Sequence, residues 1–143
     1  MLARVPVRDQ RTVSLGPLRR DPADRAVIFS TIDFGGRLVA IAGTHMAHLT
    51  DWSPRQYRRL AALLPPADTP AVLAGDMNLW GPPVSSFFPV WRRAVTGRTW
   101  PAHRPHSQLD HVLITESLSV VEGHVAEHSG SDHRPVVVRL ALA

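Results

Sequence analysis

The chain has 143 residues, of which 44% are hydrophobic and 20% charged, the composition of one globular domain that can bury a core. Cysteine is absent, which excludes disulfides, thiolate metal sites and a cysteine nucleophile. No run reaches the roughly 18 apolar residues of a membrane span, and Met1–Arg11 lacks the apolar stretch of a secretory signal. The default compartment is therefore the cytoplasm, unless a signal or membrane segment lies upstream of Met1.

The basic residues outnumber the acidic ones by 16 to 12, a net charge of +4, and all of them are arginine. Arginine recognises phosphate well because its planar guanidinium makes paired hydrogen bonds. The positive excess is compatible with an anionic substrate but does not require one. The alternative is that arginine-only usage, together with 13 prolines, reflects a GC-rich genome.

The first part of the chain predicts strands. Val5–Val7 and Thr12–Leu15 are two short candidates separated by charged residues. Ala26–Ile32 is strand-like and leads to the pair Gly35-Gly36, which predicts a hairpin turn before the returning strand Arg37–Ala42. The nearly continuous apolar run of the returning strand indicates burial on both of its faces.

A helix is predicted next. Ser53 suits its N-cap, Pro54 its first position, and Gln56 the third position of a capping box. The proline pair at 65–66 ends it. Its apolar stripe consists of Tyr57, Leu60, Ala61 and Leu64.

Short strands dominate the remainder of the chain. Ala71–Ala74 is typical of a buried strand that breaks at Gly75, and a long loop is expected from Gly81 to Pro105. Three more strands are expected at Leu109–Thr115, Leu118–Ala126 and Pro135–Leu142. Strands combined with a helix favour an α/β sandwich formed by a single domain over residues 1–143.

Four clusters of polar residues lie at the ends of these strands. They are Gly43-Thr44-His45, Gly75-Asp76-Met77-Asn78, Gln108-Leu109-Asp110-His111 and Ser131-Asp132-His133-Arg134-Pro135. If the four ends share one rim of the sheet, histidine, carboxylate and amide groups converge there. Oxygen ligands without thiols suit Mg²⁺ or Mn²⁺, and a histidine beside an aspartate suits a general base. Together the clusters indicate metal-assisted attack of water on a phosphate ester.

Each cluster alone also has an ordinary structural interpretation. Gly-Asp-x-Asn is a common turn in which side chains cap the backbone, Asp132-His133 fits a solvated turn, and His45 fits a histidine at a strand end. The combination is far more specific than any one cluster, and it favours the catalytic interpretation.

The ordered motifs resemble the endonuclease/exonuclease/phosphatase family, which includes pancreatic-type deoxyribonuclease, abasic-site endonucleases, neutral sphingomyelinases and inositol-phosphate phosphatases. The resemblance extends over nearly the whole chain and implies a four-layer α/β/β/α sandwich. It also implies a phosphoester hydrolase, either a nuclease or a phosphatase/phosphodiesterase, that uses Mg²⁺ or Mn²⁺. The residues that carry it are His45 after a buried strand, Gly75-Asp76-x-Asn78, Leu109-Asp110-His111-Val112 and Ser131-Asp132-His133-x-Pro135.

The resemblance implies which residues would bind the metal and the phosphate. Asp76 would touch the metal or orient the attacking water, and Asn78 would hold the scissile phosphate and that water. Asp132 would be a metal ligand or would support one. Such groups suit a crowded, highly charged transition state, which needs cations and donors aimed at its oxygens.

The resemblance also implies which residues would transfer protons and donate hydrogen bonds to the phosphate. His133 would be the general base or would stabilise the charge of the phosphorane, and Asp110 would hydrogen-bond His133 and fix its tautomer. His45 would donate a hydrogen bond to a non-bridging or leaving oxygen.

The chain departs from the family pattern in two respects. It matches only the later half of the family fold, a partial sandwich that lacks the N-terminal strands with their Asn and metal-binding Glu; Asp9, Asp21 and Asp24 do not follow a buried strand and are no substitutes. Gly43 stands before Thr44 where the family usually has Asn. We therefore expect an upstream segment or a second chain to complete the fold. We also expect this chain alone to bind Mg²⁺ weakly and to hydrolyse little or nothing.

Two non-catalytic alternatives remain at this stage. A structural zinc domain would use the spaced pairs His45 and His48, His103 and His106, and His124 and His128. A nucleic-acid-binding module would use Arg19-Arg20, Arg58-Arg59 and Arg92-Arg93, with Trp91 and Trp100 for stacking.

The substrate is not determined by these motifs. In the family, the stretch that corresponds to 80–106 shapes the side of the leaving group. Trp100, Arg104 and His106 are candidates for substrate contact there, in addition to Asn78. Nucleic acids, phospholipids and sugar phosphates all fit, and the alternative is that the aromatic residues of this stretch fill the core beneath a long loop.

Overall fold

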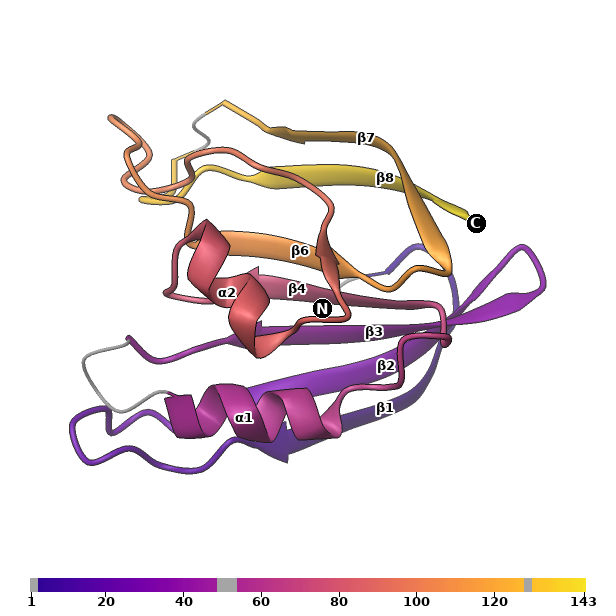
Figure 1. Cartoon of the computed structure of the whole chain (residues 1–143), viewed down its shortest axis with the longest axis horizontal. Helices are drawn as coiled ribbons and strands as arrows, with labels where there is room; N and C mark the ends of the chain where they lie inside the picture. Colours follow the sequence, from indigo (N-terminus) through magenta and orange to yellow (C-terminus); the bar gives the residue numbers. More distant parts are fainter. Residues whose placement is uncertain (1–2, 49–53, 128–129) are drawn as a thin grey trace.

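The computed structural model describes residues 3–48, 54–127 and 130–143, and Figure 1 shows them as a mixed α/β fold. Within these residues the elements, in chain order, are β1 (Val7–Ser14), β2 (Ala26–Phe34), β3 (Arg37–His45), α1 (Pro54–Leu63), β4 (Ala71–Asp76), α2 (Gly81–Phe87), β5 (Arg92–Arg93), β6 (Asp110–Ile114), β7 (Leu118–Val125) and β8 (Val136–Leu142). None of the helices in the described ranges is long and apolar enough to cross a membrane.

Six strands form one sheet in the order β1-β2-β3-β4-β6-β5, and β7 pairs with β8 in a second sheet. β2 and β3 form the predicted antiparallel hairpin, whose turn uses Gly35 and Gly36 at φ values of 63° and 85°. β3 and β4 are parallel and are connected through α1, whereas β6 runs antiparallel to β4. The C-terminal ends of β3 and β4 therefore meet the N-terminal end of β6 at one rim.

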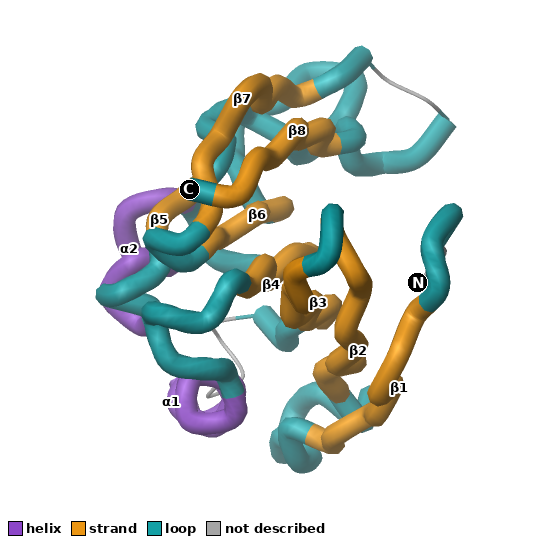
Figure 2. Tube along the Cα trace, turned by 90° about the vertical axis from the view of Figure 1, so that its right-hand side faces the viewer, coloured by secondary structure: helices purple, strands orange, loops and turns teal. Residues whose placement is uncertain are grey.

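Both helices cover the same face of the six-stranded sheet (Figure 2). Side chains alternate between the faces of a strand, so Leu73 and Leu113 point to this helical side, where Tyr57 and Leu60 of α1 are fully buried. α1 thus buries two members of its predicted stripe, while Ala61 and Leu64 are only partly buried. The predicted cap residue Ser53 lies outside the described residues.

The opposite face of the sheet is incompletely covered. β7 and β8 pack against part of it through residues such as Val138 and Leu140, but Ile32, Ile41 and Val72 remain partly exposed and border an apolar cavity of about 210 Å³. β3 is therefore not buried on both faces within the described residues, contrary to the prediction for Arg37–Ala42.

Tertiary pairing changed three predicted boundaries. The prediction of two short N-terminal strands is wrong. β1 is one strand, because residues 7–14 pair with β2 across a bulge in which Asp9 has a φ of 52°. β4 does not break at Gly75 but continues to Asp76, since both residues pair with β3 and β6. The expected loop from 81 to 105 contains α2 and β5.

Candidate active site

The sheet register places three polar residues side by side at one rim. His45, the last residue of β3, pairs with Asp76, the last residue of β4, and Asp76 pairs with Asp110, the first residue of β6. Residues directly opposite in neighbouring strands share a face of the sheet, so their side chains meet. The two carboxylates and the imidazole of this row thus come from three separate segments of the chain.

Gly75 lets β4 approach β3 closely beside this row. Its φ is 150°, and a Cβ at this position would collide with the backbone carbonyl oxygen of Thr44. The glycine of the Gly-Asp-x-Asn motif is therefore required by the backbone, and it sets the position of the neighbouring Asp76 relative to His45.

The turn after β4 is held by hydrogen bonds to its backbone and its side chains. The backbone N–H of Asn78 donates to Oδ1 of Asp76 at 2.8 Å, and the Asn78 amide donates to the carbonyl oxygen of Met46 at 2.7 Å. Asn78 has a φ of 49°, a strained conformation that persists only where surrounding contacts fix it. These contacts hold the Asn78 backbone against the Asp76 carboxylate and the Asn78 amide against the carbonyl oxygen of Met46.

Two buried side chains also hold the turn after β4 in place. The Tyr57 hydroxyl donates to the carbonyl oxygen of Met77, and Nε2 of His111 lies 2.9 Å from the carbonyl oxygen of Leu79. His111 is 1% exposed, and its Nδ1 has no hydrogen-bond partner in the described structure. Burial lowers the pKa of His111, so the ring is neutral and donates through Nε2.

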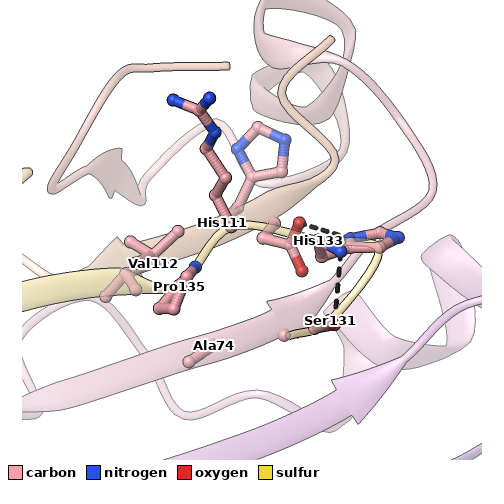
Figure 3. A pocket seen from close by; sticks show the side chains of 10 residues that line it. Ala74, His111, Val112, Ser131, His133 and Pro135 are labelled. Atoms are coloured by element: carbon pink, nitrogen blue, oxygen red, sulfur yellow. Dashed lines mark hydrogen bonds and ion pairs between the residues drawn. The ribbon is translucent and has the colours of Figure 1, made fainter. Parts of the chain in front are cut away.

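His133, from the loop before β8, completes the group. Its Nδ1 lies 2.7 Å from Oδ2 of Asp110, the contact that is drawn as a dashed line from His133 in Figure 3. Its Nε2 lies 3.9 Å from Oδ2 of Asp76, and Nε2 of His45 lies 3.5 Å from the same oxygen. Asp110 therefore binds one ring nitrogen of His133 and leaves the other directed at Asp76.

The close packing of these carboxylates and imidazoles shifts the pKa values of Asp76 and His133. Burial raises the pKa of Asp76; the hydrogen bond from the Asn78 backbone opposes this shift, and the charge of Asp110 adds to it. Burial alone would lower the pKa of His133, but the hydrogen bond and charge of Asp110, followed by the charges of Asp76 and Asp132, outweigh it and raise that pKa. The site thus holds excess negative charge that a cation would stabilise.

A cavity of about 420 Å³ opens over this group. Of the residues expected at the site, the ones that line the cavity are His45, Asp76, Asn78, Trp100, Asp132 and His133. Asp110, which is bound to His133, does not line the cavity, and neither do the exposed residues Arg104 and His106. His48 does line it; in the sequence this residue suggested only a zinc ligand, although its position three residues after His45 was a usable signal.

The donor atoms closest to one another belong to Asp76, Asp110 and His133, which lie within 4.8 Å of each other in the part of the chain that the structure describes. Asp132 is exposed and lies outside this set, and the expectation that it is a metal ligand or supports one stays a prediction. The set can hold a hard divalent cation through its carboxylate oxygens, because its excess negative charge matches such an ion.

None of the histidine pairs considered for zinc belongs to a cluster of three or more potential ligands in the described part of the chain, and His128 lies outside that part. Trp91 is 6% exposed and unavailable for stacking on a base, which weakens the nucleic-acid module. Of the aromatic residues proposed for stacking, Trp100 is the exposed one.

The fold and site together define an α/β protein with a histidine, carboxylate and amide site at the rim of its sheet. A family model matches residues 1–133, and the chain belongs to the Endonuclease/Exonuclease/phosphatase family. No curated protein matches the sequence.

Solved structures agree with this assignment. A family protein from Beutenbergia cavernae is 25% identical with a TM-score of 0.79; the alignment covers 98% of this chain and 46% of that protein. A family protein from Bacteroides vulgatus is 18% identical with a TM-score of 0.77, covering 96% of this chain and 66% of the other. The mannosyl-6-phosphatase of Bacteroides thetaiotaomicron is 16% identical with a TM-score of 0.71, covering 96% and 67%. The chain thus spans about half to two thirds of the length of these neighbours.

Proposed function

We propose that this chain carries the catalytic half of a divalent-metal-dependent phosphoester hydrolase. The observation that supports the proposal is the row His45–Asp76–Asp110 across three strands, with His133 bound to Asp110. One of its structural neighbours is described as a mannosyl-6-phosphatase, which is compatible with chemistry on a phosphate ester.

The proposed proton transfer uses the Asp110–His133 pair. With Nδ1 bound to Asp110, the neutral ring presents the lone pair of Nε2 toward the Asp76 side of the site. His133 would take a proton from the attacking water at Nε2, and in its protonated form it would stabilise the charge of the phosphorane. Asp110 holds the ring in the required tautomer, and His45 would donate to a non-bridging or leaving oxygen.

The remaining groups would bind the phosphate and the metal. The Asn78 amide would hold the phosphate and the water, and Asp76 would provide a carboxylate oxygen to Mg²⁺ or Mn²⁺, with Asp132 acting at longer range from the rim. A bound divalent cation would supply charge stabilisation to the phosphate oxygens.

We further propose that the chain alone is weakly active or inactive. Within the described residues only Asp76 and Asp110 bring carboxylates to the candidate metal position, and Asp110 is already bound to His133. The partly exposed side chains Ile32, Ile41 and Val72 leave room for more strands beside β8. An upstream segment or a second chain would cover this apolar face and add an anionic metal ligand.

An assay of two forms of the protein tests both proposals. The 143-residue chain and a version extended upstream would be compared on a phosphodiester and a phosphomonoester with Mg²⁺ or Mn²⁺. We expect little hydrolysis by the short form, and activity in the extended form that His133→Ala abolishes and His103→Ala, at an exposed loop position, preserves. Full activity of the short form contradicts the need for a completing segment. Equal activity of the two histidine variants contradicts the proposed site.

A further inference from the structure

Two segments of the chain account for its whole net positive charge. Residues 15–25 and 54–63 contain six arginines and two aspartates, and the remaining residues contain equal numbers of arginines and acidic residues. The first segment is the loop between β1 and β2, and the second is α1. The exposed arginines of the two segments, together called the arginine surface, are Arg19, Arg20, Arg55, Arg58 and Arg59.

The β1–β2 loop packs directly against α1. The amide of Gln56 donates through Nε2 to the carbonyl oxygen of Gly16 at 2.7 Å, and a Cβ added to Gly16 would lie 3.3 Å from Nη1 of Arg59. A cavity of about 350 Å³ separates the two segments and is lined by residues 15–18 together with Gln56, Arg55 and Arg59. Residues three and four apart share a face of a helix, so Arg58 lies beside the other two helical arginines. The arginines of the loop and the helix therefore form one surface.

The carboxylates of the loop have other partners. Asp21 is 9% exposed and accepts a hydrogen bond from Nε of Arg25 at 2.7 Å, and Oδ1 of Asp24 accepts one from the Ser14 hydroxyl at 2.6 Å. In the part of the chain that the structure describes, the arginines that form ion pairs are Arg25 and Arg139. The arginine surface thus keeps its charge available for an anion outside the chain.

The arginine surface borders the active site without belonging to it. The β1–β2 loop and the start of α1 lie at the end of the sheet where β3 and β4 end (Figure 1). The Arg25 hydrogen bond lowers the pKa of Asp21, with a smaller contribution from His48, which lines the active-site cavity. None of the exposed arginines lines that cavity. An extended ligand could therefore occupy the arginine surface and the cavity together.

The composition of the surface favours a phosphodiester backbone over a membrane. The large hydrophobic side chains that are exposed among the described residues all lie outside the loop and α1. A protein surface that binds a membrane typically inserts apolar side chains between the lipids, and this surface has none of that kind to insert. Guanidinium groups pair with phosphate oxygens through two parallel hydrogen bonds, and neighbouring arginines can engage successive phosphates of one strand.

We propose that the arginine surface binds the sugar-phosphate backbone of a nucleic acid strand, independently of base sequence. The proposal does not rest on the proposed function, because it requires neither the metal nor the residues of the active-site cavity. It gives the Arg19-Arg20 and Arg58-Arg59 pairs one shared surface, whereas Arg92 and Arg93 lie in β5 at the other edge of the sheet.

Fluorescence anisotropy of a labelled single-stranded oligonucleotide tests the surface. EDTA in the buffer prevents metal-dependent cleavage, so that binding alone is measured. If each exposed arginine neutralises one phosphate, the logarithm of the affinity falls with the logarithm of the salt concentration at a slope of about −3.5. An increase in salt from about 50 to about 200 mM is then expected to weaken binding roughly 100-fold.

Two double variants assign the binding to the surface. Arg58→Gln with Arg59→Gln, and separately Arg19→Gln with Arg20→Gln, are each expected to weaken binding at least roughly tenfold and to reduce the slope by about 1.4. The matched control is Arg8→Gln with Arg37→Gln, which removes the same charge from exposed positions at the opposite end of β2 and is expected to change little.

Several results would overturn the proposal. They are absence of oligonucleotide binding, affinity that does not depend on salt, equal losses in the three double variants, and equally effective competition by polyglutamate of the same charge. Binding to phosphatidylserine vesicles, but not to the oligonucleotide, would assign the surface to a membrane instead. None of these results bears on hydrolysis, which the comparison of the short and extended forms tests separately.

Discussion

Replacing Gly75 with alanine is expected to destabilise the protein and distort the site together. The position has a φ of 150°, and the new Cβ would meet the carbonyl oxygen of Thr44 in the adjacent strand. A non-glycine residue held in such a conformation costs about 1–3 kcal/mol. Relief of the collision requires β3 and β4 to separate near Thr44, which removes ladder hydrogen bonds worth about 1 kcal/mol each.

The sum is about 3 kcal/mol, a large share of the roughly 5–15 kcal/mol that stabilises a typical domain. Urea denaturation followed by circular dichroism measures this change in the free energy of unfolding. The corresponding decrease in Tm is roughly 10 °C. Because the separation occurs next to His45, the affinity for inorganic phosphate is expected to fall as well.

Gly43 provides the matched control on the neighbouring strand. No heavy atom lies within 4 Å of a Cβ built at Gly43, and its φ is outside the left-handed region. Gly43→Ala is therefore expected to leave stability unchanged or to raise it by about 0.5–1 kcal/mol. If Gly75→Ala and Gly43→Ala have equal unfolding free energies, the close approach of the two strands does not constrain the rim as described.

Three further changes probe the groups around the site. Asp110→Asn is expected to lower the pKa of His133, measured by NMR titration, because it removes the negative charge that accepts its hydrogen bond. Tyr57→Phe leaves the buried carbonyl of Met77 without its donor and is expected to cost about 1–3 kcal/mol in urea denaturation. His111 has a folded-state pKa below its unfolded value, so its contribution to stability is complete above about pH 6.5 and is lost as the pH falls toward the folded pKa. His111→Gln is expected to remove this component of the pH dependence.

Each of these three predictions has an outcome that would contradict it. An unchanged His133 titration in Asp110→Asn would mean that the pair is not formed in solution. If the Tyr57→Phe variant were as stable as the parent, the Tyr57 hydroxyl would not stabilise the turn after β4. Identical pH dependence of stability with and without His111 would mean that its ring takes up its proton as readily in the folded chain as in the unfolded one.

The sequence by itself determined several of the local elements and the family. The Gly35-Gly36 turn and the apolar stripe of α1 are short-range patterns that do not depend on distant residues, and the four polar clusters could be recognised from their order and spacing. The sequence also indicated that these clusters lie at strand ends. It could not show which of them are neighbours, because that depends on strand order and register.

Only the tertiary structure decided those relations. Antiparallel pairing with β2 made β1 one continuous strand despite its charges, and the register of β3, β4 and β6 aligned His45, Asp76 and Asp110 in a row. The folding of the loop at 99–107 put Trp100 in the lining of the cavity and packed His106 edge-on against it. Such placements arise from contacts between segments far apart in the chain, and neither residue type nor spacing encodes them locally.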